Sequence, residues 1–244
     1  MILKFPQQKS LLSVIIPIYN EKNTIDLILK KIILLKINKE IIIIDDGSTD
    51  GTSVRLNRYR ANKFIKIISL KKNFGKGYAI KQGLKISTGN LIIIQDADLE
   101  YDPIDFFQLL KPVKLNGAKF VIGSRVLSKK INKRPKGFIS ILLVYVNSFF
   151  SLLTSIIAKQ KITDPQSCYK LFTREVAKKI DLQEKGFSFC NEIIFQVRKI
   201  GIKIYEVPIS YNGRSYKQGK KITTKDGILM LIFLIKSFFI SRFT

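Results

Sequence analysis

The sequence predicts an open, doubly wound α/β domain with a mostly parallel sheet. Two patterns carry this prediction: short apolar runs rich in β-branched residues, and segments with helical spacing that alternate with them. Uninterrupted apolar strands indicate a sheet that is covered on both faces, which is typical of parallel α/β architecture. The length of 244 residues suits one large domain, or one domain with an appendage. Hydrophobic residues make up 46% of the chain, which is enough for a sizeable core.

The first strand is predicted over 12–19, where most residues are apolar and several are β-branched. A helix is predicted over 24–36, because apolar residues recur there on one helical face, at Ile25, Ile28, Leu29, Ile32 and Ile33. Residues 40–46 form a continuous apolar run that ends in two aspartates, which indicates a buried strand. A glycine-containing turn follows over 47–51.

The same alternation continues to residue 123. The expected elements are a helix that ends at Tyr59, a strand over 64–70, a helix over 76–86, a strand over 90–96, a helix over 103–111 and a strand over 119–123.

Polar residues follow three of these strands where each one ends. They are Pro17, Tyr19, Asn20 and Glu21 after the first strand, Asp45 and Asp46 after the second, and Asp96 and Asp98 after the strand over 90–96. In open α/β sheets, ligands bind beyond the carboxyl ends of the strands. Each group alone also fits turn or helix-capping chemistry, but three in register indicate a site.

Asp96 and Asp98 are two residues apart, so in extended backbone they face the same side. Such a pair, with no histidine nearby, forms an all-oxygen site that suits Mg²⁺ or Mn²⁺, and Glu100 could add a third oxygen.

Composition excludes several classes of protein. The chain has no histidine, which removes Ser-His-Asp catalysis and histidine-bearing metal sites. No GxGxxG follows the first strand and no GxxxxGK[ST] occurs, which disfavours dinucleotide-binding and P-loop chemistry. Cys168 and Cys190 form no CxxC pair or disulfide framework.

The net charge of +25 predicts anionic partners, namely phosphates, nucleic acid or an anionic membrane surface. Biased composition accounts equally well for much of this excess. Most aromatic residues lie inside apolar runs and no nucleic-acid-binding motif is present, so nucleic acid is the distant alternative and is not expected as a partner.

The order of the motifs resembles family 2 glycosyltransferases with the GT-A fold. The segments that carry this resemblance are 17–21 (PIYNE), 45–52 (DDGSTDGT), 75–77 (GKG), 95–98 (QDAD) and 123–125 (GSR). Further segments resemble the dolichyl- or polyprenyl-phosphate mannose or glucose synthase branch: 163–170 (TDPQSCYK), 187–192, 206–211 (EVPISY) and 213–222. The resemblance covers roughly residues 10–227.

The resemblance implies a role for each matching residue. Pro17, Tyr19, Glu21 and Asp46 would line the base and ribose of a nucleotide-sugar, and Asp96 and Asp98, with Glu100 less strictly, would hold the divalent cation. Arg125 and Arg214 would meet phosphate groups, assisted by Lys220 or Lys221, and Lys76 would help to bind the nucleotide-sugar. Asp164 and Glu192 would sit by the sugar or the acceptor. Many relatives carry a proline just before the position of Glu192, where this chain has Cys190 and Asn191.

The implied reaction is an inverting displacement at the anomeric carbon of a GDP- or UDP-sugar, with mannose or glucose transferred to a polyprenyl phosphate. A lipid phosphate arrives as an anion and needs no strong base, which agrees with the absence of histidine. Asp164 remains open as a weak base. If the acceptor is instead a glycan or another hydroxyl in cell-envelope polysaccharide synthesis, Asp164 or Glu192 matters far more.

Two apolar segments predict membrane association. Residues 138–158 are long enough to span a bilayer but carry polar residues on one side, at Ser140, Asn147, Ser151 and Thr154 or Ser155. This pattern favours one interfacial helix, or two short helices with a break near Asn147. The basic run at 129–136 precedes it, and residues 227–244 are apolar with two interspersed cations.

We therefore expect a GT-A domain over 1–222 with an interfacial helical insertion at about 129–160, and a membrane-associating helix over 223–244. The expected protein is cytoplasmic and peripheral at the inner membrane face, held by these segments or by a membrane-protein partner. Packing of the same helices on the sheet or in a homo-oligomer is the alternative.

Overall fold

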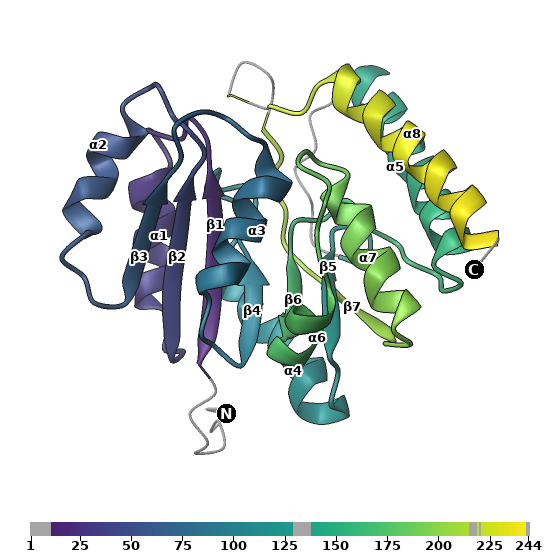
Figure 1. The fold of residues 1–244 in the computed structure, drawn as a ribbon, viewed down its shortest axis with the longest axis horizontal. Helices are drawn as coiled ribbons and strands as arrows, with labels where there is room; N and C mark the ends of the chain where they lie inside the picture. Colours follow the sequence, from purple (N-terminus) through teal and green to yellow (C-terminus); the bar gives the residue numbers. More distant parts are fainter. Residues whose placement is uncertain (1–10, 129–137, 215–218, 220, 243–244) are drawn as a thin grey trace.

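The computed structural model describes residues 11–128, 138–214, 219 and 221–242 (Figure 1). Over this part of the chain a seven-stranded sheet has the order β3-β2-β1-β4-β6-β5-β7. Its strands are β1 (Leu12–Ile18), β2 (Lys39–Asp45), β3 (Ile65–Ser69), β4 (Leu91–Ile94), β5 (Phe120–Ser124), β6 (Lys170–Thr173) and β7 (Ile204–Pro208). All neighbouring pairs are parallel except those made by β6, which runs antiparallel to β4 and β5. The mostly parallel open sheet is therefore confirmed.

Helices cover both faces of the sheet (Figure 1). They are α1 (Ile25–Leu34), α2 (Thr52–Leu56), α3 (Lys76–Ile86), α4 (Phe106–Asn116), α5 (Phe138–Ile157), α6 (Arg174–Lys179), α7 (Phe189–Lys199) and α8 (Thr224–Arg242), with 3₁₀ turns η1 (Asn57–Tyr59) and η2 (Pro103–Asp105). The chain steps outward from β1 to β2 to β3 and then crosses back to β4. Because such crossovers are right-handed, α3 lies on the opposite face from α1 and α2.

The local predictions hold closely in the first half. Ile25, Ile28, Leu29 and Ile32 of α1 are fully buried, as their spacing predicts, whereas Ile33 is 41% exposed at the margin of that face. The helix expected over 103–111 instead continues to Asn116 through Pro112. It ends where Gly117 adopts a left-handed conformation with φ 62°.

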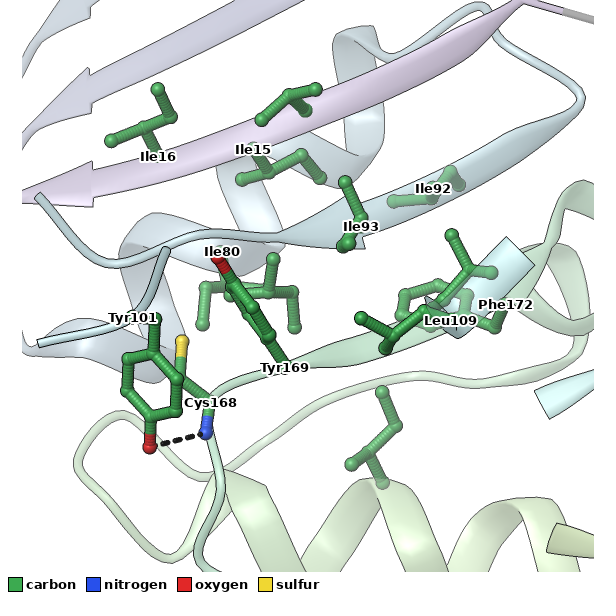
Figure 2. Close-up of a cluster of buried hydrophobic side chains, with 14 of the residues drawn as sticks. Ile15, Ile16, Ile80, Ile92, Ile93, Tyr101, Leu109, Cys168, Tyr169 and Phe172 are labelled. Carbon is green, nitrogen blue, oxygen red and sulfur yellow. Dashed lines mark hydrogen bonds between the residues drawn. The ribbon is translucent and has the colours of Figure 1, made fainter. Parts of the chain in front are cut away.

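The core is continuous across the sheet. Figure 2 shows isoleucines of β1 and β4, including Ile15 and Ile93, packed beside Tyr169 and Phe172 around β6. At one end of this cluster the Cys168 amide donates a hydrogen bond of 3.3 Å to the Tyr101 hydroxyl (Figure 2). Strand β6 therefore joins the β1–β4 half of the molecule to the half that carries β5 and β7.

A buried carboxylate stabilises the edge of the sheet where β1 and β2 begin. Glu40 accepts hydrogen bonds from the Ser13 hydroxyl and from the backbone and hydroxyl of Thr88, and it pairs with Lys66 at 2.8 Å. Although burial opposes ionisation, these bonds lower the pKa of Glu40 to about 2.

Helices α5 and α8 lie side by side at one end of the molecule, beyond β7 (Figure 1). Helix α5 is continuous, so the alternative of a break near Asn147 is wrong. Between the two helices Phe150, Met230 and Leu234 form a small buried cluster. Among the described residues, no helix combines the length and apolar character needed to cross a bilayer.

Part of the polar side of α5 faces the protein, whereas Asn147, which the sequence places on the same side, is exposed. Thr154 is fully buried and donates to the Asn191 side chain at 3.0 Å, while Ser151 and Ser155 donate to the Ile162 carbonyl. The outward surfaces of α5 and α8 are largely apolar, although Asn147 and Ser148 of α5 and Lys236 of α8 are exposed as well. We call this surface the apolar face; its exposed residues are Val144, Tyr145, Val146, Phe149, Leu152, Ile156, Ile228, Leu229, Ile232, Ile235, Phe239 and Ile240.

Candidate active site

The sheet register brings the predicted acidic residues to one edge. Ile18 of β1 lies opposite Asp45 of β2, and Ile15 lies opposite Ile94 of β4. The residues that follow these strands therefore emerge together, as the sequence predicts. The segment after β7 returns to the same edge, where the Asn212 amide donates to the Glu100 carbonyl at 2.9 Å.

Arg214 lies at the centre of a carboxylate cluster. Its guanidinium donates to both oxygens of Glu21 at 3.1 and 3.2 Å and to Asp98 Oδ2 at 3.0 Å. The Arg214 amide also donates to Glu100 Oε1 at 2.7 Å, and the Tyr211 hydroxyl donates to Glu100 Oε2 at 2.8 Å. The structure thus brings together residues that are up to 193 positions apart in the chain.

Two lysines also pair with carboxylates of this site. Lys76, the first residue of α3, pairs with Asp96 at 2.5 Å, and its ammonium lies 5.6 Å from the centre of the Phe187 ring. Lys221 pairs with Glu21 at 2.5 Å and also donates to the Tyr19 carbonyl. Lys220, which the resemblance names beside Lys221, lies outside the described residues.

Asp98 lies partly buried among the other carboxylates of the cluster. Burial, together with the nearby charges of Asp96 and Glu100, raises its pKa to about 7, and Arg214 opposes this rise only in part. Such crowding of carboxylates around Asp96 and Asp98 fits a bound cation, whose charge would favour the ionised form of Asp98.

The described residues contain no group of three or more acidic or cysteine side chains that would form a self-contained metal cage. Glu100, the third expected ligand, instead faces Tyr211 and Arg214. This donor set suits Mg²⁺ or Mn²⁺, because such ions are commonly held by one or two carboxylates together with substrate phosphates.

Arg125 and Asp164 form a separate buried pair. The Arg125 guanidinium donates to both Asp164 oxygens at 2.7 Å, and the Arg125 amide adds a bond of 2.8 Å. Although burial opposes its charge, Asp164 keeps the pKa of Arg125 above its ordinary value. The guanidinium lies 5.0 Å from the centre of the Tyr211 ring, so Tyr211 stands between this pair and Glu100.

Two other predicted carboxylates bind backbone amides. Asp46 accepts hydrogen bonds from the amides of Phe74 and Gly75, both at 2.8 Å, and burial raises its pKa. Glu192, in the first turn of α7, accepts from the amides at 183 and 184 and from the Gln196 side chain, and burial raises its pKa as well. Neither carboxylate contacts the Arg214 cluster directly.

The remaining predicted residues lie near the carboxyl end of β1. Pro17 is buried within β1 opposite Ile44, and the Tyr19 ring lies 6.0 Å below the Lys221 ammonium. Sequence reasoning assigned no role to Tyr211 or Glu206, although both lie in the 206–211 motif. The available signal for Glu206 was a carboxylate placed inside a strand-like segment.

Comparison with known proteins identifies the family. The sequence profile of the family described as "Glycosyl transferase family 2" matches residues 13–181, which is more than half of the chain. The protein belongs to glycosyltransferase family 2. It is therefore a glycosyltransferase, and the resemblance drawn from its motifs is confirmed.

Two curated relatives are similar to this family 2 glycosyltransferase over most of its length. A dolichyl-phosphate beta-glucosyltransferase of Dictyostelium discoideum is 33% identical over 228 residues, which are 85% of this chain and 68% of that protein. A dolichol-phosphate mannosyltransferase of Pyrococcus furiosus is 31% identical over 220 residues, covering 86% of this chain but only 60% of the relative.

Solved structures confirm the GT-A fold. The glucosyl-3-phosphoglycerate synthase of Mycobacterium tuberculosis, in complex with Mn²⁺, UDP and glucosyl-3-phosphoglycerate, has a TM-score of 0.68 and covers 93% of this chain and 79% of its own. Its sequence identity is 19%, so the comparison supports the fold alone.

Proposed function

We propose that this glycosyltransferase moves a hexose, mannose or glucose, from a GDP- or UDP-sugar onto a polyprenyl phosphate at the cytoplasmic face of a membrane. The two curated relatives, whose names specify dolichyl- or dolichol-phosphate transfer, support this acceptor class. The observation that carries the proposal is that each candidate base at the site already accepts hydrogen bonds from the protein.

Each candidate base is engaged by a protein donor. Both oxygens of Asp164 bind Arg125, and both oxygens of Glu192 accept backbone amides. Asp98 is assigned to the cation, and the chain has no histidine. An alcohol acceptor needs a base to remove its proton, whereas a phosphate monoester is already an anion at neutral pH. The site therefore favours a phosphate acceptor.

The proposed step is a single displacement. An acceptor phosphate oxygen forms a bond to the anomeric carbon while the bond from that carbon to the nucleoside diphosphate oxygen breaks, and the configuration inverts. Arg214 and Lys221 leave their carboxylate partners to meet the donor diphosphate, and Arg125 meets a phosphate through its planar set of donors. Glu21, Tyr19, Pro17 and Asp46 line the nucleotide side.

Asp96 and Asp98 would hold Mg²⁺ or Mn²⁺ together with the donor phosphates. When bound, the cation stabilises the charge that develops on the departing diphosphate. The crystallised synthase with Mn²⁺ and UDP supports a cation of this kind in the fold. Lys76, paired with Asp96, adds positive charge on the same side.

The apolar face of α5 and α8 is proposed to rest on the membrane surface that supplies the acceptor. Its residues are apolar on both helices, while Ser151, Thr154 and Ser155 of α5 make hydrogen bonds inside the protein. Such a surface gains free energy by leaving water for the headgroup and acyl boundary. The basic run over 129–136, proposed to dock on anionic headgroups, lies outside the described residues.

The decisive experiment supplies liposomes that contain polyprenyl phosphate with labelled GDP-mannose or UDP-glucose in separate reactions. Label is expected in an organic-extractable, acid-labile lipid for one donor. Liposomes with the unphosphorylated polyprenol serve as the matched control and should remain unlabelled. Transfer to the alcohol, or to an added glycan with no transfer to the lipid phosphate, would reject the proposal in favour of a hydroxyl acceptor.

A further inference from the structure

Glu206 holds the segment that carries Asp164. It lies in β7, paired in register with Ile122 of β5. Its carboxylate accepts the Thr163 amide at 2.9 and 3.0 Å, the Thr163 hydroxyl at 2.9 Å and the Asp164 amide at 3.2 Å. Among the described residues it makes no ion pair with a lysine or arginine. Its charge is therefore satisfied by one short stretch of backbone and one hydroxyl.

The same segment is fixed to the strand that carries Arg125. The hydroxyls of Ser124 and Thr163 share a hydrogen bond of 2.7 Å, and the next residue of each segment forms the Arg125–Asp164 pair. Each residue of the pair 124–125 thus forms a side-chain contact with the corresponding residue of the pair 163–164. Glu206, from the neighbouring strand, fixes the position and orientation of the backbone at residues 163–164.

A third contact holds the segment from the side of α5. Ser155 donates to the Ile162 carbonyl at 3.2 Å and accepts from the Ile162 amide at 3.0 Å. These bonds end at Ile162, so in the two residues that follow, Glu206 takes up both backbone amides. Loss of the Glu206 carboxylate would leave those two amides without an acceptor and release the backbone of Asp164.

We infer that Glu206 is a positioning residue for sugar transfer, which sets Asp164 and, through Asp164, the guanidinium of Arg125. Both oxygens of Glu206 are used by the 163–164 segment, so it acts through that segment and not on the substrate. The inference rests on the proposed function in one respect, namely that Arg125 meets a phosphate.

The first test compares Glu206→Ala with Glu206→Gln. Glutamine keeps a carbonyl oxygen where Glu206 Oε1 accepts three of the four contacts, whereas alanine removes all of them. Alanine should lower kcat/KM by about tenfold or more, and glutamine should restore it to within about threefold of wild type. The loss in Glu206→Ala should appear in the same parameter, KM or kcat, that Arg125→Lys changes.

Glu40→Ala is the matched control, because Glu40 is another buried carboxylate that binds a backbone amide, Thr88, but lies where the strands begin. It should lower the thermal midpoint and leave KM and kcat as in wild type. The inference is overturned if Glu206→Gln loses as much activity as Glu206→Ala, or if Glu206→Ala has wild-type kinetics.

A double-mutant cycle tests whether Glu206 acts through Asp164. Glu206→Ala should change kcat/KM little in an Asp164→Asn background, because the group that it positions is already impaired. Full additivity of the two effects would overturn the inference.

One readout does not depend on the reaction. The Nε–H of Arg125, bound to Asp164 at 2.7 Å, should give a slowly exchanging resonance in ¹⁵N spectra. That resonance should be lost to exchange in Glu206→Ala and kept in Glu206→Gln and Glu40→Ala; its persistence in Glu206→Ala would overturn the inference. If wild type fails to label lipid phosphate, the proposed function fails while this measurement still decides the role of Glu206.

Discussion

Replacing Asp164 with alanine should destabilise the protein far more than replacing a surface carboxylate. Asp164 is 4% exposed and accepts three hydrogen bonds from Arg125, whose side chain is 17% exposed. The substitution removes the carboxylate that pairs with this buried guanidinium. Removal of one partner from a buried pair costs about 3–5 kcal/mol, because the remaining charge has lost both its solvent and its partner.

The geometry of this pair supports a value of about 4 kcal/mol within that range. Each bond to a charged group contributes roughly 1.5–3 kcal/mol when it is broken, and the three bonds here share one carboxylate, so their effects overlap. The slight exposure of Arg125 admits some solvent and keeps the cost below a simple sum.

Urea denaturation at pH 7 measures the free energy of unfolding of wild type, Asp164→Ala and the double variant Arg125→Met/Asp164→Leu. The double variant should recover most of the lost stability, because two apolar side chains of similar volume leave no buried charge. It should nevertheless show no sugar transfer, since Arg125 is absent. A loss below about 1 kcal/mol in Asp164→Ala, the size typical of a surface pair, would refute this account of the pair.

Three further predictions follow from other parts of the molecule. Asp98→Ala should abolish sugar transfer and leave vesicle binding unchanged; measurable turnover would argue against the cation site. Glu40→Gln should cost roughly 2 kcal/mol at pH 7, after allowance for the half-exposed lysine partner. The pKa of Glu40 is lowered to about 2, so this stabilisation is complete above pH 4.5 and declines as the pH falls toward 2. The variant and wild type should therefore converge in denaturation experiments at the lowest pH. Ile232→Glu on the apolar face should weaken co-sedimentation with anionic vesicles. Leu115→Glu, at a 79% exposed site on α4, is the control and should not weaken it. Equal effects of the two variants would indicate a general loss of vesicle affinity and argue against docking by the apolar face.

Much of the first half of the chain could be predicted from local pattern. The runs that became β1, β2 and β4 are apolar and β-branched, and each is short enough to indicate a strand. The acidic residues that follow them meet at one edge because parallel strands end on the same side of a sheet. No long-range information is needed for that step.

The second half was not predictable in the same way. Strand β6 carries Lys170, a fully buried lysine whose ammonium binds the carbonyls of Pro165 and Ser167, so its sequence lacks a plain strand pattern. Its antiparallel insertion between β4 and β5 depends on pairing across the sheet. The polar stripe of α5 was visible in the sequence, but its direction, toward Asn191 and Ile162, was set by packing.

By itself the sequence determined the fold class, the family and the edge of the sheet where the acidic residues gather, because these follow from short-range periodicity and motif order. Only the tertiary structure decided which cation pairs with which carboxylate. Arg214 reaches Glu21, Arg125 pairs with Asp164, and Glu206 binds the backbone beside it. These contacts join residues about 40 to 190 positions apart, and side-chain pairing at that separation is fixed by how the sheet and helices pack rather than by local spacing.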